Sequence, residues 1–151
     1  KQDIAKFEQY LKEAINKSDD PKAKADYNYK LAQVYLSRKN YPLAKKYALD
    51  ALKTNPNLGD AYITIGLAYA VSSNDYEGDE FDKRTVFWAA VDKFVKAKQV
   101  DPSLTAKVNE YIERYSPHFP TKEAFFRDIT AGKSVKVGGW INETTIARFR
   151  D

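Results

Sequence analysis

Residues 24–35 read KADYNYKLAQVY, and residues 58–69 read LGDAYITIGLAY. The two stretches align at an offset of 34 positions, so that Tyr35 corresponds to Tyr69. A period of this length is typical of repeat architectures, in which each unit buries its apolar face against its neighbour. Because each copy carries apolar residues at helical spacing, the sequence predicts repeated pairs of helices.

The residues downstream of each copy predict a second helix and its end. Small residues, which let two antiparallel helices approach closely, recur there as Ala44 and Ala51 in the first unit and as Ala90 and Ala97 in the second. Asn55-Pro56 and Asp101-Pro102 follow them. These dipeptides should end the second helix of each unit, because proline cannot continue a helix and restricts the residue before it.

This pattern resembles the tetratricopeptide repeat (TPR), a 34-residue helix–turn–helix unit. The resemblance implies an all-α fold, a TPR-like α-solenoid of antiparallel helix pairs over residues 1–116. We expect a half-repeat over 1–20, repeats over 25–58 and 59–104, and a half-repeat over 105–116. The second repeat exceeds the family length by about 12 residues, and we assign the excess to an insertion over 72–84 between its two helices.

Residues 117–151 have a different character. Thr121 is a good helix N-cap, and the apolar stripe that follows it predicts a short capping helix; the stripe is formed by Phe125, Phe126 and Ile129. Residues 134–150 predict a β-hairpin, with its turn at Gly138-Gly139 or at Asn142-Glu143. Since an isolated two-stranded ribbon is marginal in water, the hairpin should either cap the solenoid or pair with another chain, which makes a homo-oligomer possible.

The segments FPTKE at 119–123, VGGWINETT at 137–145 and FWAAVDKF at 87–94 are similar to the C-terminal part of a group of bacterial TPR proteins, many of which carry secretion signals. The resemblance implies an envelope protein and favours the periplasm or envelope, with the cytoplasm left open. The chain opens on Lys1-Gln2-Asp3 without a signal peptide and contains no Met. We therefore expect a processed chain or a piece of a longer one.

Composition removes most catalytic and metal chemistry. The chain has no Cys and one His, which excludes disulfides, thiolate sites and multi-His metal sites. That residue, His118, lies in a turn, and the sequence contains no Gly-x-Ser-x-Gly element that would supply a nucleophile. Gly132-Lys133-Ser134 imitates a phosphate-binding loop, but Arg127 stands where the motif needs glycine. We predict a non-enzyme without a cofactor.

Charged segments give two weaker signals. Asp75, Glu77 and Asp79 offer carboxylates at alternate positions, as a Ca²⁺ loop would. An EF-hand register places Arg84 where the bidentate Glu belongs, so a solvated acidic loop is favoured. A net charge of +4 over 151 residues is too small to indicate a nucleic-acid partner, and no apolar run approaches the ~18 residues of a membrane span.

Ligand-facing positions of the TPR family lie on the first helix of each unit. The resemblance assigns them to Asp26, Tyr29, Gln33 and Leu36, to Asp60, Ile63, Leu67 and Ala70, and to Ala106, Asn109 and Glu113 of the last half-repeat. The two full repeats lack the family's Lys/Asn carboxylate clamp at these positions. Together with Val71, the second set contains an apolar strip, which indicates a binding site unless the C-terminal segment covers it.

We therefore expect a non-catalytic module that binds a peptide or helix of a partner protein. The alternatives are a structural cap that self-associates and an accessory segment of an enzyme encoded upstream. Most aromatic residues fall on repeat-core positions, whereas Tyr29 in the groove, Tyr76 and Phe81 in the insertion and Trp140 in the hairpin are not assigned to the core.

Overall fold

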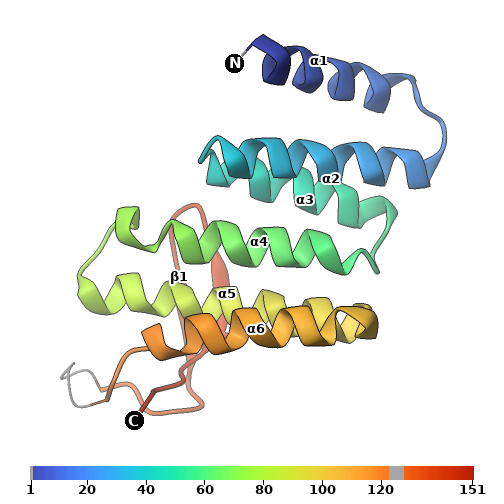
Figure 1. Cartoon of the computed structure of the whole chain (residues 1–151). Coiled ribbons are helices and arrows are strands. Elements are labelled where there is room, and N and C mark those ends of the chain that lie inside the picture. The colour runs from blue at the N-terminus through green and yellow to red at the C-terminus, as the bar shows by residue number, and fades with distance from the viewer. Residues whose placement is uncertain (1, 123–127) are drawn as a thin grey trace.

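The computed structural model describes residues 2–122 and 128–151. Within them the chain is mostly helical, with a small antiparallel hairpin near the C-terminus (Figure 1). The helices are α1 (Gln2–Lys17), α2 (Pro21–Ser37), α3 (Tyr41–Thr54), α4 (Gly59–Val71), α5 (Glu80–Val100) and α6 (Thr105–Tyr115), and the strands are β1 (Ser134–Val137) and β2 (Glu143–Ile146). The predicted helical content and the predicted hairpin are both confirmed.

Successive helices run antiparallel and pack mainly on their neighbours in the chain. The most extensive packing joins α2 to α3 and α4 to α5, while α3 also packs on α4 and α5 on α6. In Figure 1, α2 and α6 lie in front of α3 and α5. The main core runs from the α3–α4 boundary through α5 to the hairpin, and a smaller cluster joins α1, α2 and α3.

Capping residues fix where the helices begin. The side chain of Asp20 accepts a hydrogen bond from the backbone N–H of Lys22 at the start of α2. Asn40 does the same for Leu43 at the start of α3. The predicted helix ends before Asn55-Pro56 and Asp101-Pro102 are confirmed, because α3 ends at Thr54 and α5 at Val100.

The segment predicted as an insertion, 72–84, differs from expectation. Only its first part, up to Asp79, connects the helices, and it includes one 3₁₀ turn at Ser73–Asp75. Asp79 caps α5 through a capping box with Asp82, so the last five residues of the segment are helical. They lengthen α5 to 21 residues and bury Phe81 in the main core.

The backbones of α4 and α5 approach each other so closely that a methyl group would not fit between them. A Cβ built on Gly66 would lie 2.6 Å from Cε1 of Phe94 and 3.0 Å from the carbonyl oxygen of Ala90. At Gly59 it would lie 2.9 Å from the carbonyl oxygen of Ala97. The small residues of this pair are therefore required by contact.

The hairpin packs on α5, and Figure 1 draws it behind α4 and α5. Val137 pairs with Glu143, so the connecting loop is 138–142: it contains the predicted turn Gly138-Gly139, whereas Glu143 of the alternative turn Asn142-Glu143 already belongs to β2. Glycine and asparagine suit this loop because Gly139 and Asn142 have φ values of 60° and 46°. The buried apolar side chains of the hairpin belong to the main core; they are Val137, Ile141 and Ala147.

Polar contacts hold the hairpin to α5. The indole N–H of Trp88 donates to the carbonyl oxygen of Arg148. Arg148 Nη2 in turn donates to the carbonyl oxygen of Trp88 at 2.7 Å and to Asp92 Oδ1 at 2.8 Å. Trp88 is fully buried, so this reciprocal pair satisfies groups that burial would otherwise leave without partners.

The predicted capping helix lies largely outside the described residues, which exclude Phe125 and Phe126. On its two sides the chain is not helical: Thr121 forms a bridge with Arg150, and Ile129 packs half-buried against the main core. Thr121 is thus joined to the C-terminal residues by backbone pairing.

Candidate interaction surfaces

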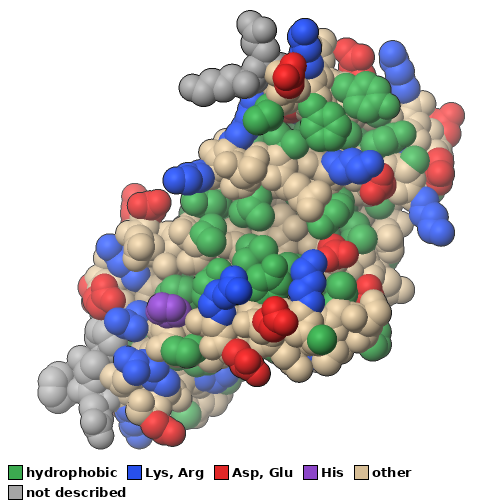
Figure 2. All heavy atoms as spheres, in the orientation of Figure 1, with side chains coloured by type: hydrophobic (Ala, Val, Ile, Leu, Met, Phe, Trp, Pro, Cys, Tyr) green, Lys and Arg blue, Asp and Glu red, His purple; other side chains and the backbone are tan. Residues whose placement is uncertain are grey.

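The predicted ligand-facing residues lie on α2, α4 and α6. Figure 2 shows this side of the molecule, where hydrophobic side chains gather over the middle of the face and charged side chains surround them. Contacts between residues of the three helices show how the face is built.

The α2 residues lie on its accessible surface. Asp26 is exposed and pairs with Lys30 at 2.9 Å. The hydroxyl of Tyr29 accepts a hydrogen bond of 2.9 Å from Gln33 Nε2. Tyr29 packs half-buried against the main core, whereas Leu36 packs half-buried against the smaller cluster. Of these four predicted residues, Tyr29 is the one that reaches α4.

A polar junction joins the three helices at Tyr29. Burial raises the pKa of Tyr29, and the Asp60 carboxylate raises it further, while a hydrogen bond with Thr64 acts in the opposite direction. Asp60 Oδ1 also pairs with Lys107 Nζ of α6 at 3.3 Å. The Asp60 carboxylate is thus close to a phenol of α2 and forms an ion pair with an ammonium group of α6.

The apolar strip expected on α4 is wrong in part. Ile63 and Ala70 are each only 3% exposed and belong to the main core. The half-buried rings of Tyr29 from α2 and Tyr111 from α6 pack against the same core. Leu67 remains half-buried at the surface.

Four further residues belong to the predicted set, of which Ala106 and Glu113 are exposed on α6. Val71 is 47% exposed at the end of α4. Asn109 on α6 is exposed, but its side-chain oxygen accepts a hydrogen bond of 2.9 Å from Lys98 Nζ of α5. Val71 is therefore available for an apolar contact, whereas the Asn109 amide already has a partner within the chain.

Beyond Val71 the face continues into a hollow of about 440 Å³ that sequence reasoning missed. Its lining comes from the end of α4, the start of α5 and the chain after α6, namely Ala70, Val71, Ser73, Asn74, Glu80, Lys83, Arg84, Phe87, Tyr115 and His118. The rings of Phe87 and His118 stack with centroids 4.8 Å apart. A helical assignment of residues 80–84 would have indicated the hollow, because these residues form the first turn of α5 and three of them line it; we expected a loop there instead.

Of the two basic side chains at this hollow, one is paired and the other is not paired within the described residues. Arg84 Nε pairs with Glu80 at 3.1 Å, and its Nη1 donates to the carbonyl oxygen of His118 at 3.3 Å. Lys83 also lines the hollow, and it forms no ion pair within the described residues. The hollow thus combines aromatic walls with one ammonium group that is not engaged.

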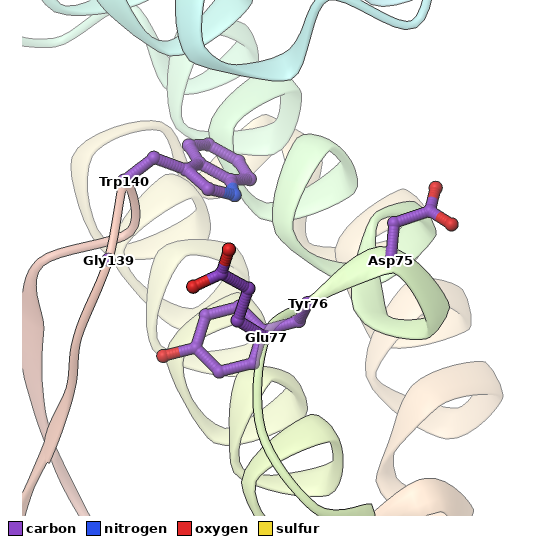
Figure 3. A pocket seen from close by; sticks show the side chains of 5 residues that line it. All are labelled: Asp75, Tyr76, Glu77, Gly139 and Trp140. Atoms are coloured by element: carbon purple, nitrogen blue, oxygen red, sulfur yellow. The ribbon is translucent and has the colours of Figure 1, made fainter.

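The acidic segment that was weighed as a Ca²⁺ loop has a different arrangement. Residues 2–122 and 128–151 contain no group of three or more His, Cys, Asp or Glu side chains placed to hold a metal ion. Asp79 is used as the N-cap of α5. Asp75 and Glu77 instead line a second pocket, of about 410 Å³, together with Tyr76, Gly139 and Trp140 (Figure 3).

In the part of the chain described, no helix has both the length and the apolar character that crossing a bilayer requires. Searches against protein-family models, curated proteins and solved structures found no match to this chain. The candidate binding regions are the face of α2, α4 and α6 with its 440 Å³ hollow and the pocket at Trp140.

Proposed function

We propose that α2–α3 and α4–α5 are TPR-like repeats and that the chain is a non-catalytic protein-interaction module. The sequence period of 34 residues supports this assignment. The close approach of α4 to α5 at Gly66 supports it independently, because the repeat pattern requires a small residue at that position. The partner is a peptide or helix of another protein.

The partner docks on the face of α2, α4 and α6, where it contacts Tyr29, Gln33, Leu67 and Val71. The observation that carries this proposal is the continuous path from the half-buried Leu67 to the exposed Val71 and on into the 440 Å³ hollow. Packed helices present such a face in advance, so docking incurs little ordering cost in the module itself.

The hollow favours one kind of partner side chain. Phe87 and His118 offer stacked rings to an aromatic or aliphatic anchor, and Lys83 offers an ammonium group to a neighbouring carboxylate. Apolar anchors in pockets supply most of the affinity of protein interfaces, and rim charges add selectivity. We therefore expect preferred partners to carry an apolar residue next to an acidic one.

Selection from a random peptide-display library tests the proposal. Peptides selected on the intact chain should lose at least about tenfold in affinity on Leu67→Glu, because a carboxylate would interrupt the apolar path. Leu49→Glu is the matched control, since Leu49 is an exposed leucine on α3, away from this face. Circular dichroism establishes that both variants are folded before binding is compared.

The selected sequences carry the second half of the test. Enrichment of an apolar residue beside Asp or Glu would agree with the hollow as the anchor site. Peptides that bind wild type and Leu67→Glu equally well, yet lose affinity on Leu49→Glu, would show that partners use the α3 side. That result would rule out the proposed face.

A further inference from the structure

Two segments that lie outside the helices of the repeats meet in the pocket shown in Figure 3. Tyr76 and Glu77 come from the connection between α4 and α5, and Gly139 and Trp140 come from the hairpin loop. The Tyr76 ring lies against the loop backbone: a Cβ on Gly139 would be 3.8 Å from Tyr76 Cε2, an ordinary van der Waals distance. Two of the aromatic residues that the repeat leaves unassigned, Tyr76 and Trp140, therefore line the same pocket.

The indole of Trp140 is held in place from the helical side. Tyr41 stacks on it with ring centroids 6.4 Å apart, and Tyr69 meets it edge to face at 5.4 Å. Lys45 Nζ donates hydrogen bonds to the carbonyl oxygens of Trp140 and Ile141. The half-buried indole is thus fixed in a preformed position while it lines the pocket.

The pocket has a negative charge. Asp75 and Glu77 are both exposed, and neither forms an ion pair within the described residues. Figure 3 shows the Glu77 carboxylate turned toward the Trp140 indole, with the Tyr76 ring below it, whereas the Asp75 carboxylate lies farther off and points away from the indole. Burial raises the pKa of Tyr76, and the Asp82 and Glu77 carboxylates raise it further. A cation entering the pocket would meet this same negative potential.

We propose that this pocket binds an alkylammonium cation, with Trp140 and Tyr76 as its aromatic walls and Glu77 and Asp75 as its counter-charges. Aromatic faces attract organic cations, and tryptophan is the strongest of them. A volume of about 410 Å³ is within the range of small-ligand sites. Lys45, which contacts the hairpin loop, already donates to the carbonyl oxygens of Trp140 and Ile141 and lies 4.0 Å from the Glu143 carboxylate.

Choline is the probe that tests the pocket, and 3,3-dimethylbutan-1-ol is its neutral isostere. Binding is followed by the two indole N–H resonances in ¹H–¹⁵N spectra at constant ionic strength, with the Trp140 signal assigned through Trp140→Phe. Choline should shift the Trp140 resonance and leave that of the buried Trp88 unchanged. The alcohol, which has the same shape without the charge, should bind at least about tenfold more weakly.

Substitutions that preserve shape establish which groups bind. Glu77→Gln should weaken choline binding by about tenfold, and Asp75→Asn by less, since Figure 3 places the Asp75 carboxylate farther from the indole. Glu13→Gln, at an exposed position on α1, is the control and should have no effect. These isosteric changes leave the Trp140 packing intact, so a loss of binding cannot be ascribed to unfolding of the hairpin.

The outcomes separate the possible ligands. N-acetyl-lysine methylamide in place of choline distinguishes a protein side chain from a free cation as the source of the ammonium group, and tighter binding of either supports the proposal. Equal binding of choline and the alcohol would overturn it, as would unchanged binding to Glu77→Gln. Displacement of choline by Ca²⁺ at equal concentration would also overturn it, because the acidic pair would then be a metal site.

Discussion

The two helix pairs share a repeat spacing but bury their second helices differently. In α3 the buried residues are Ala44, Ala48, Ala51 and Leu52, which occupy one face of a 14-residue helix. In α5 every residue from Thr85 to Val91 is buried, so this part of the helix is covered on all sides. The same repeat pattern thus gives a surface helix in one pair and a central helix in the other.

The difference arises in the connection between the paired helices. Only residues 38–40 join α2 to α3, whereas residues 72–79 join α4 to α5 and the next five residues extend α5. The added turn buries Phe81, which meets Trp88 edge to face at 6.0 Å. The extra residues therefore add Phe81 beside Trp88 on α5, and the hairpin packs on this helix as well.

The largest effect should come from the residue that joins α5 to the hairpin. Trp88→Ala should lower the free energy of unfolding by about 3–5 kcal/mol, because it empties a buried site and removes the partner of Arg148. Pro42 lies at the same place relative to Ala44 as Trp88 does to Ala90, but it is exposed. Pro42→Ala should change stability by less than about 1 kcal/mol.

Urea unfolding of both variants measures this contrast. If Trp88→Ala and Pro42→Ala lowered the free energy of unfolding equally, the burial of α5 would contribute no more to stability than that of α3. That result would contradict the proposed difference between the two helix pairs.

A smaller effect is expected at the helix crossing. Gly66→Ala should destabilise the protein by about 1–3 kcal/mol, because the added methyl overlaps the Phe94 ring and the Ala90 carbonyl. At the corresponding position of α2, Ala32→Gly should cost about 1 kcal/mol through lost helix propensity and a lost buried methyl. Thermal denaturation gives both values. A stabilising Gly66→Ala would show that α4 and α5 can separate to admit a side chain.

The smallest effect concerns the helix starts. Asp79→Ala removes the 3.0 Å hydrogen bond that the Asp79 carboxylate accepts from the backbone N–H of Asp82, leaves the reciprocal bond to the Asp82 side chain, and should cost about 1–2 kcal/mol. Asn40→Ala removes a single hydrogen bond of 3.3 Å and should cost about 0.5–1 kcal/mol. Differential scanning calorimetry at matched concentration compares the two variants. A larger loss for Asn40→Ala would reverse the expected order of dependence on the two connections.

Local signals in the sequence predicted the helix ends. Proline after Asn55 and after Asp101 stops a helix by its own covalent structure, so no tertiary contact had to be known. The hairpin was equally predictable from its β-branched residues and turn formers. The choice between two turns was not, because the loop 138–142 contains Gly138-Gly139 and also Asn142, while Glu143 begins β2.

Burial by distant segments was not predictable. Periodicity shows which side of α4 is apolar, but not that Ile63 and Ala70 are buried while Leu67 stays accessible. The pocket at Trp140 depends on a loop more than 60 positions away from Tyr76 in the chain. Such sites form only through tertiary packing, and local patterns in a single sequence do not show which distant segments meet.

The docking of the hairpin on α5 also sets an order of folding. The bond from Lys45 to Ile141 spans 96 positions and that from Trp88 to Arg148 spans 60, whereas the helices form through near neighbours, and distant contacts form more slowly. During synthesis from the N-terminus, the Trp88 face of a completed α5 must wait for about 50 further residues. At 5–20 residues per second this takes roughly 3–10 s. For that interval the nascent chain exposes an apolar surface that the hairpin later covers.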